Sequence, residues 1–335
     1  MKKQKMFAIF SAIAAAVFYA INMPASKVLL QHIAPTTMAA LLYLGAGIGI
    51  GILFLFNRKN GGENLSRQDL PYTLGMIVLD IIAPIFLMCG LSFTTSANAS
   101  LLNNFEIVAT SLITLFIFKE MISKRLWIAI VLVTLSSAIL SFEDLSSLSF
   151  SFGSLFVLLA ALCWGLENNC TRKISSKNTY QIVMLKGVFS GIGSFLVARV
   201  LHEPLPAVSL GGCALVLGFV AYGLSIFFYI KAQSVIGAAK TSAYYAIAPF
   251  VGALLSFLFL KEPFTPNYLL ALVIMLAGSL IIVLDTLAVS HEHVHTHTIA
   301  CGNDVSTVTH EHLHTHLWHT NRHHHRHASN QALHG

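Results

Sequence analysis

Ten long apolar runs follow one another along this chain of 335 residues. They lie near residues 7–26, 36–56, 71–91, 97–118, 125–141, 153–171, 182–200, 209–230, 241–260 and 267–286. Each run has roughly 18–22 residues, which is the length that one helix needs to cross the hydrocarbon core of a bilayer. The sequence therefore predicts an all-α membrane protein with ten transmembrane helices.

The small share of charged residues also indicates a membrane protein. Only 10% of the residues are charged and 56% are hydrophobic, whereas soluble domains carry about 25% charged residues. The net charge of +6 does not indicate nucleic-acid binding, because the basic residues are scattered between apolar runs. With the N-terminus inside, fourteen Lys and Arg residues fall in inside segments and three at outside ends. The positive-inside rule then predicts that both termini are cytoplasmic.

The chain also contains an internal repeat. A shift of 142 residues aligns F-I-F-K-E at 116–120 with L-F-L-K-E at 258–262, and a shift of 145 aligns residues 19–27 with 164–172. Five spans thus repeat as five spans, so the second copy enters the membrane from the opposite side, as in the inverted repeats of secondary transporters. We expect two five-helix repeats, residues 1–145 and 146–287, followed by a tail, residues 288–335.

These motifs resemble the EamA-type transporters of the drug/metabolite transporter superfamily. The resemblance rests on Trp164-Gly165, on the Lys-Glu pair that closes the fourth span of each half, and on N-F-E-I-V-A-T-S-L-I at 104–113. It covers roughly residues 7–286. It implies ten helices in two inverted halves around a central cavity, and transport of small metabolites. Tyr19-Ala20 stands where the pattern has Trp-Gly, a departure in the first span.

The fourth span carries a carboxylate near its middle. Glu106 costs about 2.5–3.5 kcal/mol inside a membrane on insertion scales, so its presence needs a reason. Asn103, Glu106, Thr110 and Thr114 are spaced by 3, 4 and 4 residues, which places them on one face of a helix running from Leu101 to Glu120. We expect this face to meet a cavity or a partner helix. The alternative is local bonding of the threonines and a protonated Glu106 against a neighbour.

The repeat makes Glu106 asymmetric. The shift of 142 aligns Asn103 with Tyr245 and Glu106 with Ala248, so the carboxylate has no counterpart in the second half. This favours a substrate or proton contact on one wall of the cavity. Tyr244, Tyr245 and a helix break at Pro249 would supply the other wall, although a proline can also be a tolerated kink.

Further pathway candidates occur in other spans. They are Asp80, Asn22, Asn104, Trp164, Glu167 and Tyr222. Asp80 could instead be a paired packing residue. Glu167 lies nearer the cytoplasmic end, where we expect it to snorkel or to pair with Arg172, and Lys186 is also expected to snorkel. Trp164 and Tyr222 could wall a cavity or pack.

Glycines recur at corresponding positions of the two halves. They are Gly45, Gly47, Gly49 and Gly51 in the second span and Gly187, Gly191 and Gly193 in the seventh. Small residues allow helices to approach closely. No Lys-Ser/Thr pair follows them, so they do not form a phosphate-binding loop.

The tail has a different composition. Fourteen of the sixteen histidines lie there, including the repeated segments H-E-H-V-H-T-H at 291–297 and H-E-H-L-H-T-H at 310–316. The candidate ligands are His291, His293, His295, His297, His310, His312, His314 and His316. Neutral imidazoles bind zinc, nickel or copper. We expect a disordered tail with loosely bound metal, or one with incidental affinity only.

We expect a non-enzymatic secondary transporter in the cell membrane that exports a small organic metabolite or drug-like compound. No Walker motif is present, so ATP bound by this chain is not the expected energy source. Alternating access would rock one five-helix half against the other, with Glu106 changing its protonation as the site changes exposure. The partners are then the substrate and the lipid bilayer, with no resident cofactor and an open oligomeric state. Two alternatives remain: a divalent-metal transporter served by the tail, and a receptor or scaffold. The spans lack a Cys-His set, which argues against metal as cargo.

Overall fold

A computed structural model describes residues 2–56, 63–119, 123–144, 149–174, 177–236, 241, 244–287, 289–301 and 304–316. The chain forms two compact units, a helical body over Met1–Val283 and a C-terminal unit over Leu284–Gly335. Each unit is described by itself. The further division of the body near residue 145 stays a prediction.

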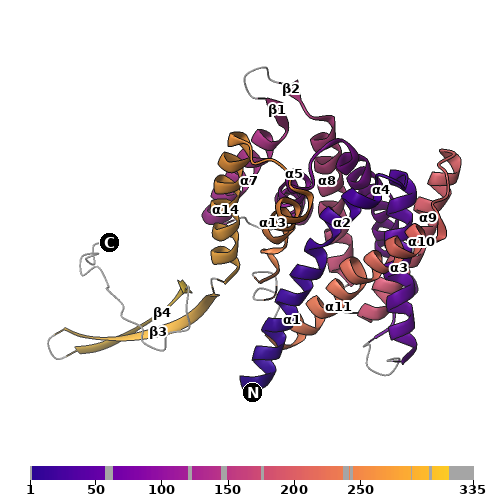
Figure 1. The fold of residues 1–335 in the computed structure, drawn as a ribbon. Helices are drawn as coiled ribbons and strands as arrows, with labels where there is room; N and C mark the ends of the chain where they lie inside the picture. The colour runs from indigo at the N-terminus through magenta and orange to yellow at the C-terminus, as the bar shows by residue number, and fades with distance from the viewer. Residues whose placement is uncertain are drawn as a thin grey trace. The chain divides into compact units, whose positions relative to one another are not determined.

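The body is built from helices (Figure 1). In its first half these are α1 (Lys2–Ala20), α2 (Asn22–Leu29), α3 (Pro35–Phe56), the short 3₁₀ helix η2 (Arg67–Asp69), α4 (Leu70–Phe93), α5 (Ser96–Leu102), α6 (Phe105–Phe118) and α7 (Lys124–Leu140). A small antiparallel pair, β1 (Phe142–Asp144) and β2 (Ser149–Phe150), follows. The second half holds α8 (Phe152–Ile174), α9 (Thr179–Val200), α10 (Val208–Gly218), the π-helix η3 (Phe219–Leu224), α11 (Ser225–Ile236), α13 (Ala248–Leu260) and α14 (Pro266–Leu287).

Eight helical segments of the described body are long and apolar enough to cross a membrane. The predicted count of ten is therefore not confirmed. The predicted spans 125–141 and 241–260 coincide with α7, which has 17 residues, and with α13, which has 13. At about 1.5 Å per residue, α13 is shorter than a hydrocarbon core of about 30 Å.

Local sequence determines where several of these helices begin and end. The side chains of Thr95, Ser123 and Asn178 accept hydrogen bonds from backbone N–H groups at the starts of α5, α7 and α9. Lys119 and Lys261 follow α6 and α13 with φ angles of 55° and 54°. The two copies of the Lys-Glu motif therefore end their helices with the same left-handed residue.

The recurring glycines bring helices together. Helix α3 packs against α9 (Figure 1), and a Cβ atom on Gly47 would lie 2.4 Å from the backbone nitrogen of Val188. A Cβ atom on Gly187 would lie equally close to the backbone nitrogen of Gly47. Close approach through small residues is thus confirmed, because no side chain fits between these two backbones.

Replacing Gly187 with alanine should destabilise the body by about 1–3 kcal/mol, because the added methyl group would force α3 and α9 apart. Thermal unfolding of the purified protein in detergent measures this change. Gly212→Ala is the matched control, because a Cβ atom there meets nothing within 4 Å. Equal melting temperatures for the two variants would contradict the close packing.

The fourth span is interrupted, so the prediction of one helix from Leu101 to Glu120 is wrong. Asn103 and Asn104 form a turn between α5 and α6. Backbone hydrogen bonds between residues three apart run from Asn104 N to Leu101 O and from Glu106 N to Asn103 O. Asparagine competes for backbone hydrogen bonds, which explains a local 3₁₀-type turn at this pair.

A second interruption lies at the corresponding place in the other half. Ala246 and Ile247 form a turn before α13, and the shift of 142 aligns Asn104 with Ala246. The helix is therefore interrupted a few residues before Pro249, where the break was predicted. Pro249 itself stands in the first turn of α13, where a missing N–H group costs no helical hydrogen bond.

The predicted disordered tail is not confirmed. Two strands of the C-terminal unit, β3 (Val289–Cys301) and β4 (Asp304–His316), pair in an antiparallel ribbon (Figure 1). Valine, threonine and isoleucine occur between the histidines, and such β-branched residues favour extended strands. The remaining tail, residues 317–335, lies outside the described part of the chain.

Candidate functional site

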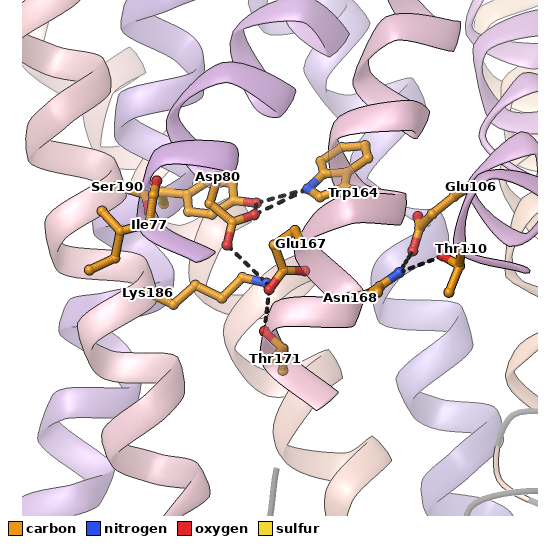
Figure 2. Close-up of polar contacts among 11 residues, drawn as sticks. Ile77, Asp80, Glu106, Thr110, Trp164, Glu167, Asn168, Thr171, Lys186 and Ser190 are labelled. Carbon is orange, nitrogen blue, oxygen red and sulfur yellow. Dashed lines mark hydrogen bonds and ion pairs between the residues drawn. The ribbon is translucent and has the colours of Figure 1, made fainter. Parts of the chain in front are cut away.

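Glu106 lies in the first turn of α6, directly after the Asn103–Asn104 turn. Its Oε1 atom accepts a hydrogen bond of 2.6 Å from Asn168 Nδ2 of α8, and the same nitrogen lies 3.3 Å from Thr110 Oγ1 (Figure 2). Glu106 and Thr110 therefore share one partner, as their predicted common face requires. This face meets a partner helix. The side chain of Thr114 is outside the described residues.

Asp80 is the centre of a second polar network. Its Oδ1 atom accepts hydrogen bonds from Tyr43 Oη at 2.9 Å and from Trp164 Nε1 at 3.2 Å. Its Oδ2 atom forms an ion pair of 3.0 Å with Lys186 Nζ, which lies 3.0 Å from Glu167 Oε1 as well (Figure 2). We call Asp80, Glu167 and Lys186 the charged triad. It joins α4, α8 and α9.

The triad overturns two predictions. Lys186 does not snorkel: its side chain is only 16% exposed and lies between two carboxylates. Glu167 does not snorkel either, because its side chain is 2% exposed. Asp80 on α4 is far in sequence from Glu167 and Lys186, which lie on the consecutive helices α8 and α9. The opposite charges of the triad stabilise one another away from water.

The triad holds two acids and one base. If both carboxylates were ionised, one negative charge would remain beside the single lysine. That charge would be buried, because Asp80 is fully buried and Glu167 nearly so. Glu167 also accepts a hydrogen bond from Thr171 Oγ1. An uncompensated buried charge is unfavourable. The arrangement can therefore take up one proton or one cation.

Tyrosines surround the turn between α5 and α6. The ring centroid of Tyr19 lies 5.9 Å from that of Tyr222 and 6.0 Å from that of Tyr245. Asn103 Nδ2 donates a hydrogen bond of 3.0 Å to Tyr19 Oη, and Asn22 Nδ2 donates one of 3.0 Å to Tyr222 Oη. Residues from α1, α2, the α5–α6 turn and η3 thus meet Tyr245, which directly precedes the Ala246–Ile247 turn. We call these five residues the tyrosine cluster.

Two polar atoms beside the tyrosine cluster are unsatisfied. Asn103 Oδ1 and Asn104 Nδ2 are buried and have no hydrogen-bond partner among the residues that the structure describes. The two side chains are 6% and 3% exposed. A buried polar group without a partner costs about 1–3 kcal/mol, so these atoms are natural contacts for a ligand.

The structure brings together most of the predicted pathway residues, but not all. Asp80, Trp164 and Glu167 belong to one network, and Tyr245 joins the tyrosine cluster. Tyr244 is 37% exposed and has its side chain outside the cluster. The prediction that it helps to wall the site is not supported by this placement.

Sequence reasoning missed Tyr19, Tyr43 and the buried role of Lys186. Tyr19 was noted only as a departure from Trp-Gly, although it precedes Asn22 in the repeated motif. Tyr43 and Lys186 are polar residues in the middle of mostly apolar runs. That signal could have marked both of them as partners of Asp80.

Charged residues also bind backbone groups at helix ends, and one of these contacts joins the two halves. The carboxylate of Glu262 accepts hydrogen bonds of 2.7 and 2.8 Å from the backbone nitrogens of Ser96 and Ala97 at the start of α5. Lys27 Nζ donates to the carbonyl oxygens of Leu91 and Thr94 at 2.6 and 2.7 Å. Both contacts complement the charge of a helix end. They hold the α4–α5 connection from two sides.

Comparison with known proteins identifies the family. The model of the EamA-like transporter family matches residues 6–142 and 151–284. The chain belongs to the EamA-like transporter family. The predicted resemblance is thus confirmed, and with it membership of the drug/metabolite transporter superfamily and a multi-pass membrane location.

Relatives of this EamA-like transporter carry the same general description. An "Uncharacterized transporter" of Methanothermobacter thermautotrophicus is 28% identical over 300 residues, covering 83% of this chain and 87% of that protein. "Uncharacterized transporter YyaM" of Bacillus subtilis is 23% identical over 242 residues, covering 69% and 79%. A solved crystal structure shares the fold with a TM-score of 0.58 and 16% identity, covering 83% of this chain and 95% of the other.

Proposed function

We propose that this EamA-like transporter is a secondary transporter that exports a small organic metabolite by proton-coupled alternating access, with both termini in the cytoplasm. The observation that carries the proposal is the Asn103–Asn104 turn with its unpartnered amide atoms. Interrupted helices at corresponding positions of two repeats are where secondary transporters bind substrate. Polar backbone at membrane depth is tolerated where it lines such a site.

The chemistry of the turn supports a substrate that carries both hydrogen-bond donors and an acceptor. Asn103 Oδ1 can accept a hydrogen bond and Asn104 Nδ2 can donate one. Glu106 adds a carboxylate that also accepts from Asn168 and is close enough to interact electrostatically with the Tyr19 hydroxyl. Tyrosine faces attract organic cations. A small molecule with an ammonium group near a carbonyl or hydroxyl fits these groups.

Proton coupling follows from competition for one carboxylate. A proton and an ammonium group both neutralise Glu106, so the two would bind in turn. A proton that enters from outside would displace the substrate outward, and its release to the cytoplasm would free Glu106 for the next substrate. The charged triad has one acid in excess and includes Glu167, the neighbour of Asn168 on α8. It would therefore favour proton uptake in the same region.

Alternating access requires contacts between the halves that open and close. The Glu262 contact with Ser96 and Ala97 joins the loop after α13 to the start of α5, on the side predicted to be outside. We assign it to the outer gate, since substrate that leaves outward must pass between the halves. Its copy in the repeat, Glu120, lies outside the described residues.

Export is tested by comparing the metabolites in the medium of cells that overexpress the protein with those of deletion cells. Enrichment of a compound, followed by its counterflow in proteoliposomes, is the expected result. If no compound differs between the media and none shows counterflow, the chain acts as a receptor or scaffold instead.

Asn104→Ala should reduce this flux about tenfold, while the free energy of unfolding changes by no more than about 1 kcal/mol. The Asn104 Nδ2 atom has no hydrogen bond to lose among the described residues, but the variant would lose the hydrogen bond to the substrate. Ser111→Ala is the matched control, because that hydroxyl bonds the Ile107 carbonyl of its own helix. Equal flux through both variants would move the substrate site away from the turn.

A further inference from the structure

The helices α5 and α13 meet along a seam of small and polar residues. The two helices pack against each other (Figure 1). Ser256 Oγ of α13 lies 2.8 Å from Ser96 Oγ of α5, and a Cβ atom on Gly252 would lie 2.9 Å from Ser100 Oγ. We call these four residues the α5–α13 seam. It adjoins the contact assigned above to the outer gate, because Glu262 binds the backbone nitrogen of Ser96.

One polar atom of the seam lacks a partner. Ser100 Oγ is buried and forms no hydrogen bond among the residues that the structure describes, and the side chain is only 2% exposed. The hydroxyl points at α13, as its short distance from the Gly252 position shows. Ser256, by contrast, bonds the Gly252 carbonyl of its own helix at 2.7 Å. An unsatisfied buried hydroxyl is unfavourable, so close packing of two helices does not by itself explain a serine at position 100.

The seam leads away from the proposed substrate site. Ser96, Ser100 and Asn104 are spaced by four residues, which places them along one side of the same segment. At about 1.5 Å per residue, this segment is ~12 Å long, close to half of a hydrocarbon core of about 30 Å. Asn104 Nδ2 is itself without a partner among the described residues. The row of polar groups therefore runs from the turn toward the side predicted to be outside.

The sequence repeat relates the α13 side of the seam to the face that carries Glu106. The shift of 142 aligns Thr110 with Gly252 and Thr114 with Ser256. In an inverted repeat, corresponding elements face opposite sides of the membrane around a shared central site. The α13 side of the seam is therefore the copy of the Glu106 face that serves the outer half of the path.

We propose that the α5–α13 seam opens to the outside and forms an exit subsite for the substrate. The hydroxyl groups of Ser96, Ser100 and Ser256 bind the substrate after it leaves the Asn103–Asn104 turn. The inference rests on the proposed export function. Because a hydroxyl both donates and accepts hydrogen bonds, the subsite takes a small polar molecule. Opening separates Ser256 from Ser96 and gives Ser100 Oγ its missing partner.

The first test measures opening and needs no substrate. Intact cells that produce the full-length protein with Ser100→Cys are treated with a membrane-impermeant, positively charged thiol reagent, and labelling is followed by the mass of the purified protein. Ser136→Cys is the matched control, because Ser136 is equally buried and bonds the Ala271 carbonyl between α7 and α14. We expect Ser100→Cys to be labelled at least about tenfold faster, since the control thiol is exposed only by local unfolding. Both variants are made in a background whose native cysteines are replaced by alanine. These are Cys89, Cys163, Cys170, Cys213 and Cys301.

The second test closes the seam and measures flux of the exported metabolite in the same background. Ser96→Cys combined with Ser256→Cys places two thiols where the hydroxyl groups now meet. Oxidation should lower flux at least about tenfold, because outward opening is part of the transport cycle, and reduction should restore it. Each single variant is the control and should keep its flux under oxidation. Ser100→Ala should slow flux about threefold through the loss of one hydrogen bond, whereas Ser111→Ala should not.

Three results would overturn the proposal. The first is labelling of Ser100→Cys that is no faster than that of Ser136→Cys, or that occurs only from the cytoplasmic side of inverted vesicles. The second is unchanged flux through the oxidised pair, and the third is equal flux through Ser100→Ala and Ser111→Ala. Labelling from outside in cells that export no metabolite would support the opening of the seam and contradict the export function, so the two failures are distinguishable.

Discussion

Lys186→Met is expected to destabilise the helical body by about 3–5 kcal/mol, because it leaves two buried carboxylates without their base. Asp80 and Glu167 each lie 3.0 Å from the lysine nitrogen, and without it the two carboxylates would repel each other unless at least one were protonated. The measurement is thermal unfolding of the purified protein in detergent, together with the amount of folded protein in the membrane.

A second substitution should distinguish lost charge balance from lost packing. Asp80→Asn and Glu167→Gln combined with Lys186→Met remove all three charges, and an amide oxygen at position 80 can still accept the hydrogen bonds from Tyr43 and Trp164. We expect this triple change to recover most of the stability lost in Lys186→Met, and Glu167→Gln alone to have a small effect because Asp80 and Lys186 remain paired. A triple variant as unstable as Lys186→Met would show that the lysine acts through its bulk.

Glu106→Gln is expected to abolish flux driven by a pH gradient, with little change in expression or melting temperature. A glutamine oxygen can still accept the hydrogen bond from Asn168, so the contact between α6 and α8 survives. The amide cannot exchange a proton, and coupling is lost with it. The measurement is flux, with and without a pH gradient, of the metabolite found in the comparison of media.

Glu63→Gln is the matched control for this change. It removes a carboxylate that is 77% exposed and pairs with Lys177, away from the network of Figure 2. Its flux should keep its dependence on the pH gradient. Should Glu106→Gln remain coupled, Glu106 would serve as a substrate contact only, and the proton would have to be carried by the charged triad.

The tyrosine cluster and the charged triad show where sequence reasoning reached its limit. Glu106 and Thr110 were correctly placed on one face because both lie on α6 and the helical period is a local property. Their partner Asn168 is 62 residues from Glu106, in the second half of the body, and no helical period connects the two. For the same reason Lys186 was expected near the membrane surface, although tertiary packing places it between Asp80 and Glu167.

The sequence alone determined the membrane class, the approximate positions of most spans and the transporter family, because the length of apolar runs and the recurrence of motifs are local properties of the chain. Only the tertiary structure decided that the Asn103–Asn104 pair interrupts a helix beside Tyr19. It also decided that Lys186 lies between two acids, Asp80 and Glu167. Both arrangements depend on contacts between helices, whose geometry is set by how the helices pack.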